Sequence, residues 1–391
     1  RGLGDVYKRQ YLRNRYAEIQ SNTLRQAYSA TDTGLGIRIV KGKRLGFSYT
    51  NRLDEESVKK AVERALTSAL ASKPDPHWKS LPQPSGNYPQ VQRTYSEKLE
   101  RTESSTLVEL AGQLLDLLTR DRRIVVVVGE VLVSAWRVAI VSSHGIDVED
   151  RGTVAVVGAE VVAREGGDVT PGVFEEEVSR TEIPDVEKLA ERLSEKALDS
   201  LRPIKVESGR LPVIMTHCAL EPLFAYTFNQ AIRGDNVVRG RSPYRGRIGE
   251  VVASELLTIV DDGTLEGGLA SSRFDGEGVA KRRTLIIERG VLRGFIYDSY
   301  WGARAGREST GNAARAGYAS TPSVSPSNLV VSPGDYSEEE LLEETERGLL
   351  VDGLQGAHSS NPETGEFSVV AAPAWYVRRG EIRAVRGVML A

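Results

Sequence analysis

Short glycine turns between apolar runs constrain the fold of this chain more than any other feature. Lys41-Gly42-Lys43 separates two apolar segments, and Arg289-Gly290 and Arg379-Gly380 mark two later hairpins. Connections this short join antiparallel neighbours, because parallel strands need a long crossover. Segments of strand character also outnumber segments of helical character. The pattern therefore predicts a multidomain α+β fold, rich in antiparallel β-sheet with amphipathic helices packed on it.

Several segments carry helix signals. Asp54 and Asp185 precede amphipathic stripes as N-caps, and Ser337 opens a capping box with a helix through Leu349. A Leu-rich helix is expected over about 104–119, and another after the strand Leu211–Met215, ending near Ala231. Between the Leu-rich helix and Asp185 we expect four strands, over 123–132, 137–142, 145–149 and 154–164.

The 391 residues leave room for two or three domains. Residues 1–73 form an N-terminal α+β domain, and residues 74–95, with five prolines, are interpreted as a linker. A central domain then covers 96–208 and a C-terminal domain covers 209–391. The chain lacks an initiator Met and ends on an apolar strand, so we expect a fragment with both terminal domains truncated. Residues 1–10 need not be native sequence.

Composition indicates a soluble protein of a reducing compartment. Hydrophobic residues make up 40% and charged residues 27%, and the net charge of −3 gives no bias toward nucleic acid. The single cysteine, Cys218, excludes an internal disulfide framework. No apolar run approaches the ~20 residues that span a bilayer, and no signal peptide is visible. We therefore expect a cytoplasmic location, no membrane partner and no nucleic-acid partner.

His217 is the strongest of the four histidines as a candidate for chemistry. It follows a short apolar strand that leads into a helix, and a His in the first turn of such a helix is where a protease could hold zinc. A catalytic zinc needs typically three protein ligands and a nearby base. Glu221 is the only other good local ligand. Pro222 argues against this pair, because proline is tolerated only in a helix's first turn. The helix is therefore expected to start between Ala219 and Pro222.

A Gly-rich loop over 234–249 is the main basic feature. Arginine suits carboxylates and phosphates, so the loop could hold a peptide C-terminus, a nucleic-acid backbone or an acidic partner surface, or simply be solvated. Asp261-Asp262-Gly263, after an apolar strand, is interpreted as a turn. The basic cluster is formed by Arg233, Arg239, Arg241, Arg245 and Arg247.

A series of segments, taken in order, resembles the TldD/PmbA family. The N-terminal segment is Gly34–Arg38, the central ones are 137–147 and 162–168, and the C-terminal ones are 234–242, 249–254, 257–262, 274–279, 297–300 and 309–313. Each is modest alone, but their order and spacing are specific. The resemblance covers about residues 12 to 391.

The family has two branches, and the resemblance implies which one this chain joins. TldD-like members carry a zinc-binding His-Glu-x-x-x-His helix with a further ligand near the C-terminus, whereas PmbA-like (TldE) members lack it and pair with TldD in a peptide-processing protease. Here the first motif His falls on His217, the Glu on Cys218 and the second His on Pro222. We therefore expect a non-catalytic subunit of the PmbA-like branch. No metal is expected in this chain, with His217 and Glu221 as vestiges of the site and zinc in a TldD-type partner.

Five residues are expected to line the substrate groove or the subunit interface: Arg239, Arg241, Ser309, Thr310 and Asn312. The expected substrates are peptides or unfolded proteins. Two alternatives stay open. One is a self-sufficient metallopeptidase that uses His217 and Glu221 with a distal ligand, and the other is a binding module built on the loop Arg233–Arg247. The sequence does not determine the substrate, the partner or whether the oligomer is homomeric.

Overall fold

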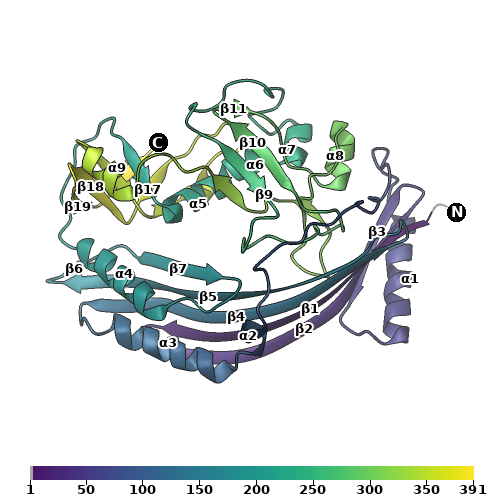
Figure 1. Ribbon diagram of the computed structural model, residues 1–391, viewed down its shortest axis with the longest axis horizontal. Helices are drawn as coiled ribbons and strands as arrows, with labels where there is room; N and C mark the ends of the chain where they lie inside the picture. The colour runs from purple at the N-terminus through teal and green to yellow at the C-terminus, as the bar shows by residue number, and fades with distance from the viewer. Residues whose placement is uncertain (1–2) are drawn as a thin grey trace.

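The computed structural model describes residues 3–391, and a long curved antiparallel sheet forms its base (Figure 1). The strand order is β3-β2-β1-β4-β5, with β6 and β7 both paired to β5. The strands are β1 (Leu3–Gln20), β2 (Thr23–Lys41), β3 (Arg44–Thr50), β4 (Ile124–Ser142), β5 (Asp147–Glu165), β6 (Asp168–Val169) and β7 (Val173–Ser179). Because β1 pairs with β4, the N-terminal and central segments share one sheet rather than forming separate ones.

The prediction of four short strands over 123–164 was wrong, since β4 and β5 each run without interruption. The reason lies in which face of the sheet is covered. In β4, Val131 and Val133 are buried in the core that contains α3, whereas Ile140 is buried in the core that contains Phe274 of the C-terminal segment. Along each strand the buried residues therefore switch from one face of the sheet to the other. In the sequence, this switch interrupts the alternation of apolar and polar residues and resembles the end of a strand.

Helices cover the convex face of the sheet at both ends. α1 (Glu55–Ala71) packs on β2 and β3, while α3 (Ser104–Leu118) and α4 (Val186–Asp199) pack on the other half beside the short α2 (Glu97–Arg101). The predicted caps are confirmed, because Asp54 accepts a hydrogen bond from the Ser57 amide and Asp185 accepts one from the Glu187 amide. Each helix thus begins where its capping residue predicts.

The segment 74–95 contains no helix or strand, but it is not a solvated tether. Trp78 and Leu81 are buried against Val6, Ile140 and Phe274. The segment thereby helps to seal the contact between the sheet and the C-terminal region.

The C-terminal region lies over the concave face of the sheet (Figure 1). One four-stranded sheet has the order β11-β10-β9-β14, and another has the order β19-β18-β15-β8, in which β8 is parallel to β15. The strands are β8 (Val213–Met215), β9 (Ile259–Asp262), β10 (Arg283–Glu288), β11 (Val291–Leu292), β12 (Ala313–Ala314), β13 (Ser323–Val324), β14 (Leu329–Val331), β15 (Gly348–Val351), β16 (Leu354–Gln355), β17 (Val369–Ala371), β18 (Ala374–Arg378), β19 (Glu381–Val385) and β20 (Val388–Leu390).

Short helices complete this region. The hairpins predicted at Arg289-Gly290 and Arg379-Gly380 are confirmed, and the capping box of Ser337 is present, although its helix ends at Glu344 because β15 follows. The loop expected over 234–249 instead contains a helical turn. The helices are α5 (His217–Tyr226), α6 (Phe228–Ala231), α7 (Gly234–Arg239), α8 (Ser299–Ala305), α9 (Glu338–Glu344) and the 3-10 helix η1 (Ala357–Ser359).

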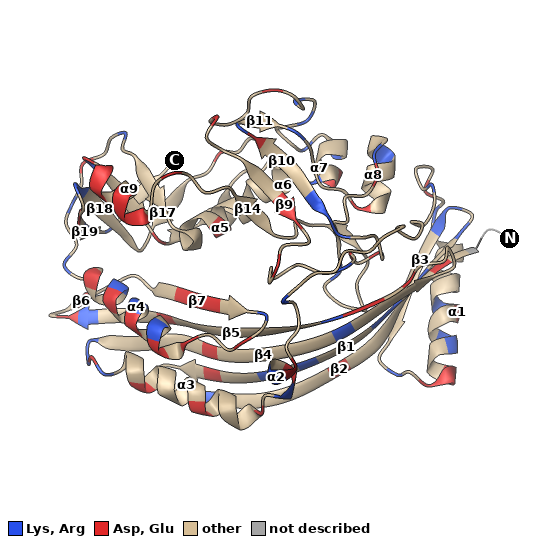
Figure 2. Ribbon diagram, in the orientation of Figure 1, with Lys and Arg blue, Asp and Glu red and all other residues tan. Residues whose placement is uncertain are grey.

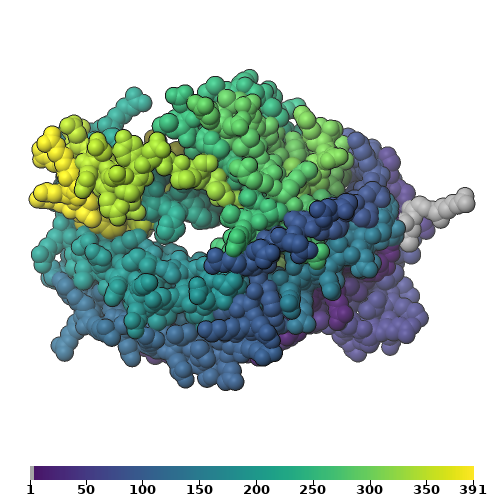
Figure 3. All heavy atoms as spheres, in the orientation of Figure 1, coloured from purple at the N-terminus to yellow at the C-terminus, as the bar shows by residue number. Residues whose placement is uncertain are grey.

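The two layers meet at both ends and leave an opening between them, which the space-filling view shows (Figure 3). At one end, Arg38 of β2 forms a buried ion pair of 3.0 Å with Glu277. The α+β architecture rich in antiparallel sheet is thus confirmed. Among residues 3–391, no helix combines the length and apolar character that a membrane crossing requires.

Candidate functional site at the start of helix α5

His217 is the first residue of α5, with Thr216 as its N-cap. The predicted helix start near Ala219 to Pro222 was wrong, because the Leu220 amide already bonds to the Thr216 carbonyl at 3.0 Å. Pro222 lies inside the helix instead. Its missing N–H leaves the Cys218 carbonyl without the usual helical donor. The first turn of α5 therefore has one backbone hydrogen bond fewer than a helix without proline.

His217 and Glu221 are both exposed on α5. The Nε2 atom of His217 lies 3.3 Å from the Cys218 thiol, and Glu221 lies close enough to Glu176 of β7 to contribute to the raised pKa of that residue, of which burial is the main cause. Within residues 3–391, the one group of three potential metal ligands that converges includes neither His217 nor Glu221. Among these residues the Cys218 thiol lies beside His217, but His217 and Glu221 are not part of a three-ligand group.

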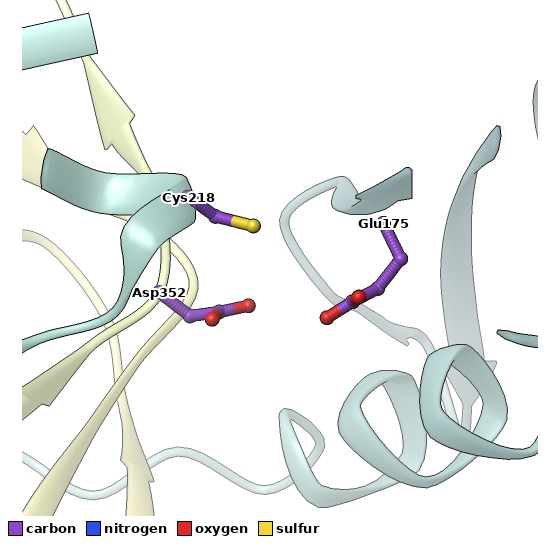
Figure 4. A group of neighbouring side chains, drawn as sticks. All are labelled: Glu175, Cys218 and Asp352. Atoms are coloured by element: carbon purple, nitrogen blue, oxygen red, sulfur yellow. The ribbon is translucent and has the colours of Figure 1, made fainter. Parts of the chain in front are cut away.

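The converging group consists of Glu175, Cys218 and Asp352 (Figure 4). Their ligand atoms all lie within 4.8 Å of one another. Glu175 comes from β7, Cys218 from the first turn of α5, and Asp352 directly follows β15. The group thus joins the curved sheet to the C-terminal region at the end of the molecule opposite the Arg38–Glu277 pair. None of the three was predicted as part of this group from the sequence.

A lysine of the same chain is the counter-ion of these carboxylates. The Nζ atom of Lys196, on α4, lies 2.9 and 3.0 Å from the two oxygens of Asp352 and also donates to Glu175. The hydroxyl of Thr216 donates to Asp352 at 2.7 Å, and Arg192 lies 3.8 Å from the second oxygen of Glu175. The two carboxylates are therefore compensated by two protein cations and by hydrogen bonds.

The pKa shifts at this cluster keep the Cys218 thiol neutral and the Lys196 amine charged. Burial raises the pKa of the Cys218 thiol to about 11, and the carboxylates of Asp352 and Glu175 add to the shift. At neutral pH, and without a bound metal ion, this group is therefore a neutral thiol. Burial alone would lower the pKa of Lys196, but its hydrogen bond to Glu175 and the charge of Asp352 outweigh it and raise that pKa. Lys196 therefore stays charged among the oxygens.

Three of the five arginines of the basic cluster form ion pairs within α7 and its flanks. Asp235 pairs with Arg233 at 3.0 Å and with Arg239 at 3.6 Å, and Arg247 pairs with Glu250 at 2.8 Å. The guanidinium of Arg239 also lies over the ring of Trp301, at 4.6 Å from its centroid. The side chains of this loop therefore mainly stabilise its own helical turn, although Arg241 is exposed.

The side chains of Ser309–Asn312 form hydrogen bonds inside the C-terminal region. The hydroxyls of Ser309 and Thr310 both donate to the Tyr297 carbonyl. Asn312 is 1% exposed, and its amide donates to the carboxylate of Asp261 at 2.6 Å. This burial places the Asn312 side chain inside the C-terminal region. Asp261, interpreted from the sequence as a turn residue, is instead a buried residue of β9.

Comparison with known proteins places these features in a family. Three family models match, described as PmbA/TldA metallopeptidase domain 1 over residues 5–69, the central domain over 96–201 and the C-terminal domain over 208–391. The structure of TldE from Thermococcus kodakarensis is similar with a TM-score of 0.92 and 34% identity, covering 98% of this chain and 86% of that one.

Two curated relatives match over most of their length. An uncharacterized protein of Methanocaldococcus jannaschii is 32% identical over 354 residues, which are 89% of this chain and 79% of the relative. Metalloprotease PmbA of Escherichia coli O157:H7 is 27% identical over 374 residues, which are 94% of this chain and 78% of the relative. With all three family models matched in order, the chain belongs to the PmbA/TldD metallopeptidase family.

Proposed function

We propose that this chain is the PmbA/TldE-like, non-catalytic subunit of a heterodimeric metalloprotease that acts on peptides or unfolded proteins. The observation that carries this proposal is the position of Lys196. Its ammonium lies among the oxygens of Glu175 and Asp352, beside the first turn of the helix in which TldD-like members of the family would hold zinc. A charged amine there competes directly with any metal ion.

The donor set supports the same conclusion. A catalytic zinc site typically combines three ligands with an open position for water. His217 lies outside the converging group found among residues 3–391, the Lys196 ammonium lies among the carboxylates of that group, and Pro222 offers no ligand atom. The residues of this chain therefore do not fit the family's metal. The chemistry would come from a TldD-type subunit, and this chain would shape the space in which peptides meet it.

The partner and the location follow from the same proposal. An opening lies between the curved sheet and the C-terminal region (Figure 3). We propose that these two layers form one side of the space that the heterodimer encloses. Acidic residues are prominent on β7 and α9, whereas α4 carries both acidic and basic residues (Figure 2). The composition, with one free cysteine, fits a cytoplasmic enzyme.

Zinc content and peptidase activity test this proposal. The chain is purified alone and together with a TldD-type subunit, and bound zinc and the cleavage of an unfolded protein such as reduced casein are measured. We expect neither zinc nor cleavage for the chain alone and both for the pair. Stoichiometric zinc together with cleavage by the chain alone would overturn the proposal.

Two substitutions separate the alternatives. Replacing His217 with Ala should leave the activity of the pair nearly unchanged, whereas a self-sufficient metallopeptidase would lose its activity. Neutralising Arg239 and Arg241 should likewise have little effect. A binding module for polyanions would instead show steeply salt-dependent binding that these changes abolish.

A further inference from the structure

The outer edge of strand β2 is open over the first half of the strand. β1 pairs with β2 along its whole length, but on the other side β3 pairs only with Leu35–Lys41. In the described part of the chain, Thr23–Asp32 has no strand on that side, and every residue in it is exposed. We call this segment the free edge. A bulge at Arg25 interrupts its start and leaves a regular run over Gln26–Asp32, about 23 Å long at ~3.3 Å per residue.

The free edge lacks most devices that keep exposed strands apart. Edge strands are usually protected by lysine, proline, short length or bulges, because their unpaired backbone groups otherwise recruit another strand. Apart from the bulge at Arg25, Thr23–Asp32 has none of these and contains no Lys, Pro or Gly. By contrast β19, the outer strand of a C-terminal sheet, carries exposed Glu381 and Arg383.

The charges on the free edge are already engaged within the chain. Arg25 forms an ion pair of 3.3 Å with Glu18, and Asp32 accepts a hydrogen bond of 3.0 Å from the Tyr318 hydroxyl. The Arg25 charge is therefore compensated by Glu18, and the Asp32 carboxylate is held in place by a hydrogen bond from the neutral Tyr318 hydroxyl. The ring of Tyr28 lies 5.3 Å from that of Tyr16 on the neighbouring strand and is still 47% exposed, so a partner could cover it further.

We propose that the free edge pairs with an edge strand of the TldD-type subunit, so that the curved sheet continues across the heterodimer. This inference rests on the proposed function, because it names the surface by which that partner binds. A subunit of the same fold brings a sheet with similar twist, which main-chain pairing requires. Two curved sheets joined in this way would enclose more of the concave face than one sheet does.

A substrate strand fits this edge less well than a subunit. The sheet order places β1, β4 and β5 between β2 and β7, so the free edge is about 19 Å from β7 at ~4.8 Å per strand spacing. The start of α5, with Lys196 and Glu175, lies on the β7 side. A peptide on the free edge would therefore lie away from that region, whereas a permanent neighbour has no need to reach it.

A lysine at the free edge tests the proposal. Ala30→Lys places a charge on the exposed strand, opposite Asn14 of β1, where it should hinder pairing without disturbing the core. The matched control is Leu70→Lys, an equally drastic change at an exposed position of α1. Dissociation constants are measured for the wild-type chain and both variants with the TldD-type subunit, and thermal unfolding of each chain alone checks folding. We expect the dissociation constant to rise about tenfold or more for Ala30→Lys and to be unchanged for Leu70→Lys.

Two prolines give a second test in case the lysine is tolerated. Neighbouring amides of a strand point in opposite directions, so of Ser29→Pro and Ala30→Pro one removes an outward N–H and the other removes an N–H directed at β1. The variant that keeps its wild-type unfolding temperature is the outward one, and it should bind the partner more weakly.

The outcomes separate the two proposals. If the wild-type chain does not bind a TldD-type subunit, the proposed function fails. If it binds and Ala30→Lys and the outward proline bind equally well, only the role of the free edge fails. If the chain alone forms a dimer that Ala30→Lys dissociates, the occupant is a second copy, and the proposed partner is wrong.

Discussion

The ammonium nitrogen of Lys196 lies 2.9 Å from a carboxylate oxygen of Asp352, although 156 residues separate the two along the chain. Lys196 belongs to α4 and packs with the curved sheet, whereas Asp352 follows β15 of the C-terminal region. Lys196 therefore supplies a positive charge at the candidate site, and its contact with Asp352 connects the two layers of the molecule.

Replacing Lys196 with Met should destabilise the protein by about 3 kcal/mol, because two nearly buried carboxylates lose their shared counter-charge. Chemical denaturation measures the change. The control is Lys188→Met on the same helix, where an exposed pair with Asp185 at 4.0 Å is worth less than ~1 kcal/mol. Equal effects of the two substitutions would show that the Lys196 contact contributes no more than an exposed pair.

The Lys196→Met variant should also gain affinity for zinc. In the wild-type chain the ligand atoms of Glu175, Cys218 and Asp352 lie within 4.8 Å of one another, and in the absence of the ammonium a divalent ion can supply the lost positive charge. Added zinc should raise the unfolding temperature of this variant and leave the wild-type temperature unchanged. A second change, Cys218→Ser, should weaken the gain. A zinc-dependent rise in the wild-type chain would contradict the competition between lysine and metal.

The single cysteine reports on the same cluster. Since burial and the carboxylates of Asp352 and Glu175 raise the pKa of Cys218 to about 11, alkylation by iodoacetamide should be slow at pH 8 and should accelerate only in strongly alkaline solution. Asp352→Asn removes one of the charges that raise this pKa and should increase the rate at pH 8. Asp335→Asn, at an exposed position, serves as the control and should leave the rate unchanged.

A buried carboxyl in the C-terminal region should make stability depend on pH. Burial and the charges of Glu277 and Asp275 raise the pKa of Asp298 to about 7, above the ~3.9 of an unfolded Asp. Its favourable contribution is complete below the unfolded pKa and is lost as the pH rises through about 7. Asp298→Asn keeps a good N-cap for the Trp301 amide. Urea unfolding at pH 5 and pH 8 should therefore show a smaller loss of stability for this variant than for the wild type.

The control for this pH effect is Asp54→Asn, which also changes an N-cap. The pKa of Asp54 is lowered, mainly by the hydrogen bond from the Ser57 amide, so its titration moves away from the range between pH 5 and pH 8 and should not alter that comparison. An unchanged slope for Asp298→Asn would mean that Asp298 is ionised throughout this range.

Substitution in the buried ion pair at the other end of the molecule should also lower the free energy of unfolding. The side chains of Arg38 and Glu277 are 7% and 1% exposed, and Glu277 also accepts hydrogen bonds from Ser299. Arg38→Met leaves a buried charge and should cost about 3 to 5 kcal/mol in unfolding free energy. Arg25→Met, which breaks an exposed pair with Glu18, should cost less than ~1 kcal/mol.

Local features of the fold were predictable from the sequence. The N-caps at Asp54 and Asp185, the capping box at Ser337 and the two later hairpins lie where the pattern placed them. The interruption predicted in β4 and β5 was wrong, because the face that is buried depends on which layer covers each half of the strand. The start of α5 was also misplaced, because helix-start rules do not include the packing that tolerates Pro222 inside the helix.

The sequence by itself determined which ligand types stand at the start of α5. The sequence places His217, Cys218 and Pro222 at this helix start. A proline side chain offers no ligand atom in any fold. Only the tertiary structure decided that Lys196 occupies the place of a cation there. Capping and periodicity act between residues a few positions apart, whereas the partners of Lys196 lie 21 and 156 residues away. Their meeting depends on how the C-terminal region packs over the curved sheet, which no local pattern encodes.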